Sequence, residues 1–205
     1  MNLPSFPELH FYEEKHIYTL DLGQTLELPS VTQILRFVSR EIYGDVPLHT
    51  LEFAADRGTR VHESIEMYEK YGWMEADNDI MPYILAYQDW VKEHKYKTAA
   101  SEYRFYHRTR LYAGTADRLF LDGDDLCLMD IKTSQEVYEL LTGAQEYGYV
   151  EALKSHGINV KQAYILHLRN DASFNWIKAD LNKGRTMFEA CAYLHSELKR
   201  EVNHG

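Results

Sequence analysis

The alternation of apolar and polar residues predicts a mixed sheet with helices around it. Near the start, two short alternating segments predict strands, and Ser30 is a typical helix cap ahead of three spaced apolar residues. Apolar positions three and four residues apart then predict two longer helices, the second with Asp77 or Asn78 as its cap and Pro82 in its first turn. These early elements are expected as strands at 9–13 and 16–20, a helix from about 48 to 71, and a helix after 78.

The middle of the chain changes to β-branched, aromatic and aliphatic residues, which favour strands. Asp122-Gly123-Asp124-Asp125 indicates a turn between two of these strands. The later elements are expected as strands at 101–108, 111–122 and 126–133, a helix at 137–156, strands at 161–169 and 174–179, and a helix at 182–202. The order of helix, three strands, helix and strand predicts an α/β fold with a mixed sheet, extended by an N-terminal hairpin and helices and by a C-terminal strand and helix.

Length and composition favour one globular domain. The chain has 205 residues with ordinary hydrophobic (45%) and charged (26%) fractions, and no repeat or long linker divides it. We expect a single domain over 1–205, with an N-terminal hairpin and helix extension (1–47), a catalytic core (48–180) and a C-terminal helix (181–205). No signal-peptide pattern and no bilayer-spanning apolar stretch is recognisable, so we expect a cytoplasmic protein without membrane partners.

Cysteine content and charge narrow the classes of protein. Cys127 and Cys191 each lie between apolar residues, so we expect buried thiols, and two cysteines are too few for an iron–sulfur cluster or a four-cysteine zinc site. The net charge of −10 argues against a simple nucleic-acid binder with a basic surface. It leaves a metal-dependent nuclease open, because acidic ligands add negative charge that a bound metal offsets in part.

Carboxylates lie among apolar residues on two of the predicted strands. Because side chains alternate along a strand, Asp130 and Lys132 share a face with two leucines, and Asp117 is also on a largely apolar face of the preceding strand. An unpaired buried charge is strongly unfavourable, so other groups must compensate these charges. One interpretation is a structural ion pair of Asp130 or Asp117 with Lys132 or Arg118.

The other interpretation is a site for a hard cation. Asp117 and Asp130 would bind the cation through oxygen atoms, with the backbone carbonyl of Ile131 as a further ligand. Lys132 would orient the attacking water and stabilise charge in the transition state. We favour this interpretation because one lysine does not balance two acids.

The same residues resemble the signature of a nuclease superfamily. Asp117, followed thirteen residues later by Asp130-Ile131-Lys132 on the predicted order of elements, resembles the PD-(D/E)XK superfamily and its restriction-endonuclease-like αβββαβ core. Gly58-Thr59-Arg60-Val61-His62 resembles the G-x-x-x-H motif of its RecB-like and phage exonuclease branch, in which the histidine is a metal ligand. Gln145-Glu146-Tyr147-Gly148-Tyr149 resembles the Q-x-x-x-Y motif of that branch, in which the two named residues contact DNA.

Each supporting residue has a simpler alternative. His62 would otherwise be a solvated or salt-bridged helix residue, Tyr149 a core residue and Gln145 a surface residue. Glu102 lies in an element where some members of the superfamily place an acid near the metals, and its alternative is an exposed, salt-bridged glutamate. Gly58 inside a helix costs about 1 kcal/mol relative to alanine, which a close packing contact would explain.

The resemblance implies a DNA exonuclease that hydrolyses phosphodiester bonds in phage-type DNA recombination, repair or processing, and a phage or bacterial origin. The implied cofactor is Mg²⁺ or Mn²⁺, as one or two ions, with no nucleotide cofactor. The implied partners are DNA, a single-strand annealing or recombinase protein, and further copies of the chain. The implied site residues are Asp117, Asp130, Lys132 and Glu102 for catalysis, His62, Asp117, Asp130 and Ile131 for the metal, and Gln145, Tyr149 and Arg60 for DNA.

Two other functions stay open beside this one. An endonuclease of the same fold would differ only in the DNA that it accepts. A non-catalytic nucleic-acid-binding or assembly protein is favoured slightly by the net charge of −10.

Overall fold

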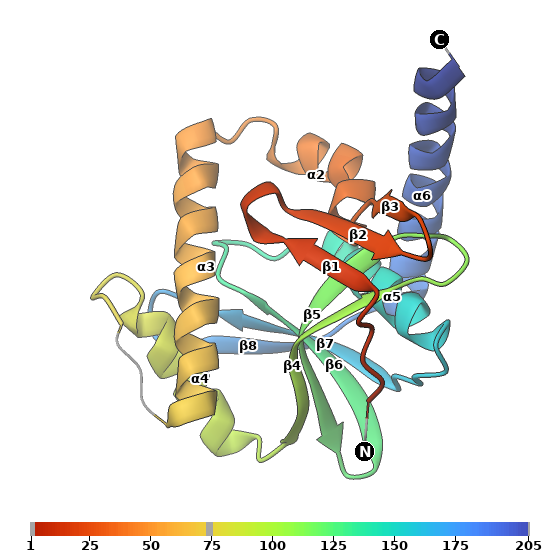
Figure 1. The fold of residues 1–205 in the computed structure, drawn as a ribbon. Coiled ribbons are helices and arrows are strands. Elements are labelled where there is room, and N and C mark those ends of the chain that lie inside the picture. Colours follow the sequence, from red (N-terminus) through yellow and green to blue (C-terminus); the bar gives the residue numbers. More distant parts are fainter. Residues whose placement is uncertain (1–2, 73–75, 205) are drawn as a thin grey trace.

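Two sheets organise the chain in the computed structural model, which describes residues 3–72 and 76–204 (Figure 1). Residues 1–2, 73–75 and 205 of the expected single domain lie outside that part. The smaller sheet has three antiparallel strands, β1 (Leu9–Tyr12), β2 (Ile17–Asp21) and β3 (Thr25–Leu28), and a short 3-10 turn, η1 (Glu13–Lys15), joins the first two.

The larger sheet is mixed, as the sequence predicts. Its order is β4-β5-β6-β7-β8, and only β6 and β7 pair in parallel. Parallel pairing follows because helix α5 (Glu139–Lys154) carries the chain back between these two strands. The strands are β4 (Lys97–Tyr106), β5 (Ala113–Asp122), β6 (Asp125–Lys132), β7 (Gln162–Leu168) and β8 (Phe174–Lys178).

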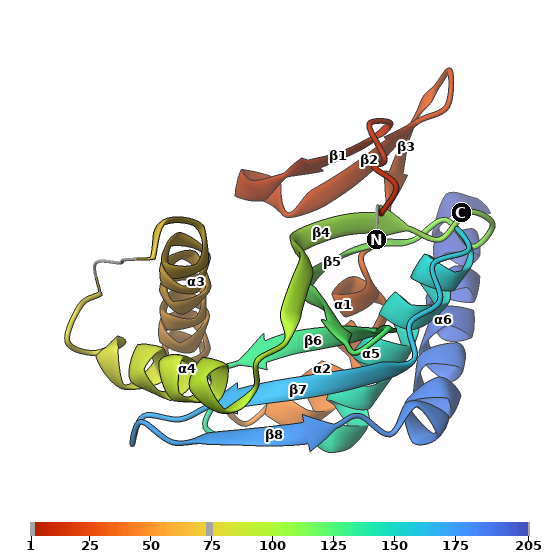
Figure 2. The same ribbon diagram turned by 90° about the horizontal axis from the view of Figure 1, so that it is seen from below.

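Helices cover both faces of the larger sheet (Figure 2). One core joins Leu126 and Leu128 of β6 to residues of α1 (Val31–Ile34), α5 (Glu139–Lys154) and α6 (Leu181–His204). A second core joins the opposite face of β6 to α3 (Leu48–Tyr71) and α4 (Met81–Glu93), while α2 (Arg36–Tyr43) has no buried residue. The predicted alternation of β6 is therefore confirmed, and the α/β fold class with it.

The first residues of α1 and α4 test the predicted helix caps. Ser30 caps α1 as predicted, since its hydroxyl accepts from the backbone N–H of Gln33 and the Gln33 side chain accepts from the N–H of Ser30. The helix that follows is divided at Leu35 into α1 and α2. Pro82 lies in the first turn of α4 as predicted, but the predicted cap at Asp77 or Asn78 is wrong, because Ile80 is the cap residue and no side chain bonds there.

The structure differs from the predicted strands in two places. Strand β3 was not among the predicted elements, and β4 begins at Lys97 rather than at residue 101. Cys127 and Cys191 are buried free thiols, as predicted. Within the described residues, every helix is too short or too polar to cross a membrane.

Helices α5 and α6 cross where two glycines meet. A Cβ atom on Gly184 would lie 2.1 Å from the carbonyl oxygen of Gly143. Gly58 in α3 differs, since a Cβ there would meet only the Thr133 hydroxyl at 3.5 Å, an ordinary contact. The close packing contact that the sequence suggested for Gly58 is therefore wrong, and the close approach lies instead at Gly184, which the sequence did not indicate.

Alanine at these two positions should have opposite effects on stability. Gly184→Ala should lower the free energy of unfolding by about 2 kcal/mol or more, because backbone atoms cannot move aside as a flexible side chain can. Gly58→Ala should raise it by about 0.5–1 kcal/mol through helix propensity. Urea unfolding followed by circular dichroism measures both, and equal effects would show that the helix crossing tolerates a methyl group.

Candidate metal centre

Three side chains that can bind a metal come together from α3, β4 and β5. His62, Glu102 and Asp117 each offer a ligand atom, and these atoms lie within 4.8 Å of one another. Glu102 lies opposite Asp117 in the sheet, because the pairs Ser101–Arg118 and Tyr103–Ala116 flank them. The three residues, with Glu66 and Ile131 among others, line a small crevice.

Asp117 lies where two strands of the sheet separate. The paired residues of β5 and β6 end at Arg118 and Met129, so the next N–H groups of β6 lack a strand partner on that side. The Asp117 carboxylate takes that place and accepts from the backbone N–H of Ile131 at 2.6 Å. Its other oxygen is 3.6 Å from His62 Nδ1. Asp117 therefore joins the backbone of β6 to the cluster.

The orientation of His62 is set by a backbone carbonyl. Its Nε2 is 3.1 Å from the carbonyl oxygen of Ile131. In the tautomer that this contact favours, Nε2–H donates to the carbonyl and the lone pair of Nδ1 faces Asp117. A metal-binding histidine usually donates its second nitrogen in this way. The Ile131 carbonyl, which the sequence suggested as a metal ligand, accepts from the histidine in this structure, and its role as a ligand stays a prediction.

Glu102 enters the cluster through an unusual backbone conformation. Its φ of 45° lies in the left-handed region, which is rare for a residue other than glycine. Desolvation of its carboxyl, and next the negative charge of Asp117, raise the pKa of Glu102 to about 7. Two carboxylates crowded beside an imidazole fit a divalent cation, which would remove their mutual repulsion.

Lys132 belongs to a hydrogen-bonded group next to the cluster. Its Nζ is 2.7 Å from Asp130 and donates to the Gln145 amide oxygen at 3.2 Å. The Gln145 nitrogen donates to Asp130 at 2.8 Å and to the Tyr149 hydroxyl at 3.0 Å. Burial by itself lowers the pKa of Lys132, but Asp130 and Asp117 outweigh it, so the net shift is upward and the amine is protonated at neutral pH.

Asp130 lies beside this lysine and outside the cluster of three. Both of its oxygens face Lys132 or Gln145, so the ion pair that the sequence offered as an alternative is observed. Burial raises the pKa of Asp130, and the nearby Lys132 opposes that shift. A role of Asp130 as a ligand stays a prediction.

The three residues expected to contact DNA are placed differently from that expectation. Gln145 and Tyr149 are buried, at 9% and 6% exposure, and their polar atoms bond within the group around Lys132. The core alternative for Tyr149 is confirmed, and the surface alternative for Gln145 is wrong. Arg60 bonds to the carboxylates of Asp56, Asp77 and Asp79, so its donors face acidic side chains and not the cluster.

An ion pair that the sequence did not indicate lies beside the cluster. Arg118 is 3% exposed, and its guanidinium bonds to Glu69 and to the Tyr87 hydroxyl. The alternative in which Arg118 pairs with Asp117 or Asp130 is therefore wrong. In the sequence, Glu69 is one of several charged residues on a long predicted helix, and no local pattern indicates that it pairs with Arg118.

Glu146 is a second residue that the sequence did not indicate. Its side chain is fully buried, and neither carboxylate oxygen has a hydrogen-bond partner among the described residues. Burial, and then the charge of Asp130, raise the pKa of Glu146 well above its usual value. Its place inside the Q-x-x-x-Y motif, directly after Gln145, was the one available signal.

Glu146→Gln should flatten the dependence of stability on pH. The folded chain retains a proton that the unfolded chain loses above about pH 4.3, so the free energy of unfolding falls as pH rises toward the folded pKa. The slope from this group is about 1.4 kcal/mol per pH unit in that window. Urea unfolding at several pH values tests this, with Glu93→Gln, an exposed site at the end of α4, as the control. Parallel curves for the wild type and Glu146→Gln would contradict the expectation.

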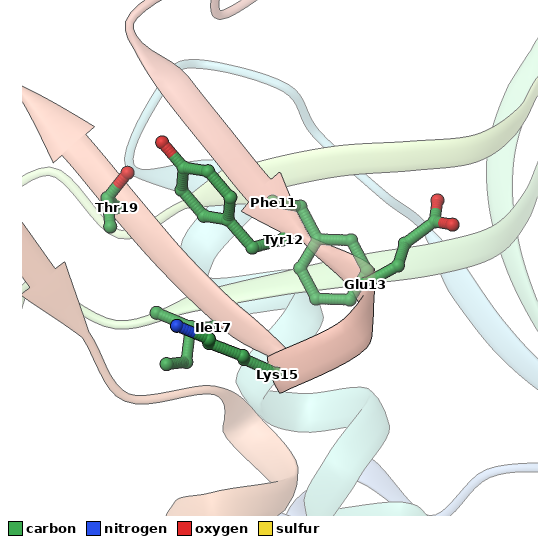
Figure 3. Close-up of a pocket in the computed structure, with 6 residues that line it drawn as sticks. All are labelled: Phe11, Tyr12, Glu13, Lys15, Ile17 and Thr19. Carbon is green, nitrogen blue, oxygen red and sulfur yellow. The ribbon is translucent and has the colours of Figure 1, made fainter.

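The small sheet packs beside the cluster. The Tyr18 hydroxyl is 2.8 Å from the Thr115 hydroxyl, two residues before Asp117. On the hairpin itself lies a hollow of about 700 Å³ (Figure 3). It carries no grouping of metal-binding side chains within the described residues, so the candidate chemistry lies at the crevice. The lining residues are Phe11, Tyr12, Glu13, Lys15, Ile17 and Thr19.

Comparison with known proteins finds likeness in fold only. No protein-family model and no curated protein matches the chain. Among solved structures, LHK-Exo in complex with dAMP has a TM-score of 0.40 and 13% identity, over 86% of this chain and 90% of that chain. A second structure of that alkaline exonuclease, from Laribacter hongkongensis, has a TM-score of 0.33 and 15% identity, over 71% and 85%. The structure of SSO0001 has a TM-score of 0.33 and 14% identity, over 66% and 73%. At these values the likeness concerns the general course of the chain and no individual residue.

Proposed function

We propose that this chain is a divalent-metal-dependent DNA nuclease of the PD-(D/E)XK type that hydrolyses phosphodiester bonds. The observation that carries the proposal is the cluster of His62, Glu102 and Asp117, with ligand atoms within 4.8 Å of one another, next to the hydrogen-bonded amine of Lys132. Two carboxylates beside one imidazole suit a divalent cation better than a purely structural ion network, because the two negative charges exceed what the imidazole can balance.

The three clustered residues would hold the metal. Carboxylate oxygens suit Mg²⁺ and Mn²⁺, whereas an imidazole nitrogen favours a transition metal, so Mn²⁺ should bind more tightly than Mg²⁺. A bound divalent ion supplies Lewis acidity toward a phosphoryl oxygen and lowers the pKa of water. The predicted extra ligand Asp130 belongs to this proposal.

Lys132 supplies a fixed positive charge. Its protonated amine, held by Asp130 and Gln145, can donate to the attacking water or to a phosphoryl oxygen, and it stabilises the negative charge that develops there. Gln145 and Tyr149 act as positioning residues, because they orient the Asp130–Lys132 pair without reaching the surface.

Exonuclease action in phage-type DNA recombination, repair or processing is the finer form of this proposal. It rests on the joint order of the G-x-x-x-H, D-x-K and Q-x-x-x-Y motifs. The annealing or recombinase partner and the assembly of several copies are further predictions from the same resemblance. Linear end-labelled DNA and a covalently closed circle separate exonuclease from endonuclease, because only an endonuclease cuts the circle.

Calorimetry and hydrolysis test the proposal together. Wild-type protein should bind Mn²⁺ and should degrade end-labelled DNA only when Mg²⁺ or Mn²⁺ is added. Absence of both metal binding and cleavage would instead favour the non-catalytic protein that the charge of −10 suggests.

A further inference from the structure

A phosphodiester substrate meets an electrostatic barrier at this site. The crevice carries Glu66, Glu102 and Asp117, and the whole chain has a net charge of −10. A DNA strand needs positive charge beyond the scissile phosphate, because contacts to phosphates supply most of its affinity. The cationic side chains near the crevice therefore decide where the strand can lie.

Most nearby cations are already bound to protein groups. Lys132 is held by Asp130, and buried Arg118 is held by Glu69. Arg60 bonds to three aspartates. Arg57 donates to the carbonyl of Thr133 and lies over two aromatic rings.

Arg104 is in a different situation. Its side chain is 45% exposed, and its ion-pair partner is Glu13, at 3.4 Å and itself 79% exposed. Its guanidinium carbon lies 5.3 Å from the centre of the Phe11 ring, which supports the flat group without using its donors. Such an exposed pair is weak and readily exchanged for a phosphate.

Arg104 also lies at the right place relative to the cluster. It follows Glu102 by two residues on β4, and it pairs across the sheet with Thr115, which precedes Asp117 by two on β5. Two residues along a strand span about 7 Å, so Arg104 lies beside the cluster without being part of it. The bond of Tyr18 to Thr115 holds the small sheet against this part of β5, next to Arg104.

We propose that Arg104 binds a backbone phosphate of the DNA strand next to the phosphate that is hydrolysed. This inference rests on the proposed nuclease function. Glu13 competes for Arg104 when no DNA is bound, and its side chain points away from Lys15 and Thr19 (Figure 3). Arg104 thus takes the DNA-binding role that the sequence analysis gave to Arg60.

The test measures DNA binding separately from cleavage. Labelled DNA is titrated with Mg²⁺ present at several salt concentrations, using Lys132→Ala combined with Asp130→Asn as a common background, in which hydrolysis is slow enough for binding to be measured first. Arg104→Ala should weaken binding roughly tenfold, since a charge-assisted hydrogen bond is lost. It should also lower the slope of log affinity against log salt by about 0.7–0.9, which is the value of one phosphate contact. Arg104→Lys should preserve most of the slope.

Glu13→Gln gives the opposite result if Arg104 is the phosphate ligand. It should tighten binding severalfold by releasing the guanidinium, and this gain should disappear when Arg104→Ala is added. Arg200→Ala is the matched control, because it removes the same charge from the end of α6 that projects beyond the sheets (Figure 1).

The outcomes separate this inference from the proposed function. Unchanged affinity and salt slope in Arg104→Ala, or an equal loss in Arg200→Ala, would overturn the role of Arg104 while leaving metal-dependent cleavage by the wild type intact. A gain from Glu13→Gln that persists without Arg104 would overturn the competition between them. Failure of the wild type to cleave DNA would instead overturn the nuclease proposal.

Discussion

Lys132→Ala should reduce the rate of DNA hydrolysis by about 10²–10³-fold while Mn²⁺ binding persists. The amine lies next to the cluster but offers it no ligand, so its loss removes charge stabilisation in the transition state and leaves the metal-binding groups in place. Single-turnover hydrolysis of end-labelled DNA and calorimetry with Mn²⁺ measure the two properties. Full activity in this variant would remove Lys132 from the mechanism.

Two further variants protect this experiment from a folding artefact. Loss of the amine leaves Asp130 buried without its cation, which can destabilise the fold. Lys132→Ala combined with Asp130→Asn removes that unpaired charge and should remain inactive with a higher midpoint of unfolding than the single variant. Lys161→Ala removes an exposed lysine before β7 and should keep full activity.

Asp117→Asn should abolish both Mn²⁺ binding and hydrolysis, with an activity loss on the order of 10³-fold. The amide can still accept from the N–H of Ile131, so the fold should be retained, but it lacks the charge that holds a cation. Asp117→Ala should have the same effect on activity and should also lower the free energy of unfolding by about 1–3 kcal/mol, because that N–H loses its acceptor.

The contrast between the two residues makes this prediction specific. Lys132→Ala separates metal binding from chemistry, whereas Asp117→Asn should remove both. Normal Mn²⁺ affinity in Asp117→Asn would show that the metal, if bound, lies elsewhere. Equal unfolding free energies for Asp117→Ala and Asp117→Asn would contradict the structural role of the Ile131 contact.

Local chemistry made several features predictable. The cap at Ser30 depends on a hydroxyl and on a residue three positions later, both visible in the sequence. The shared face of Asp130 and Lys132 follows from the period of a strand, and the ion pair between them follows from that face. The spacing of four residues between Gln145 and Tyr149 likewise brings them to one side of a helix, where their side chains bond.

Contacts between distant segments were not predictable in this way. Glu102 reaches the cluster because its backbone adopts a left-handed conformation opposite Asp117, which no strand pattern signals. Arg118 lies next to Asp117 in sequence, yet it pairs with Glu69, which is 49 residues away. Arg60 forms ion pairs with Asp77 and Asp79, which lie in the segment before α4.

By itself, the sequence determined which residues face inward and which spacings bring side chains onto one face, because these depend on the periods of helices and strands. The tertiary structure decided which charged groups from distant segments of the chain meet. It grouped His62 with Glu102 and Asp117, directed the Ile131 carbonyl to the histidine, and left Arg104 beside the cluster in an exposed ion pair with Glu13. The physical reason is that buried charges take partners by proximity in space, and the packing of α3 and the separation of β5 from β6 create that proximity.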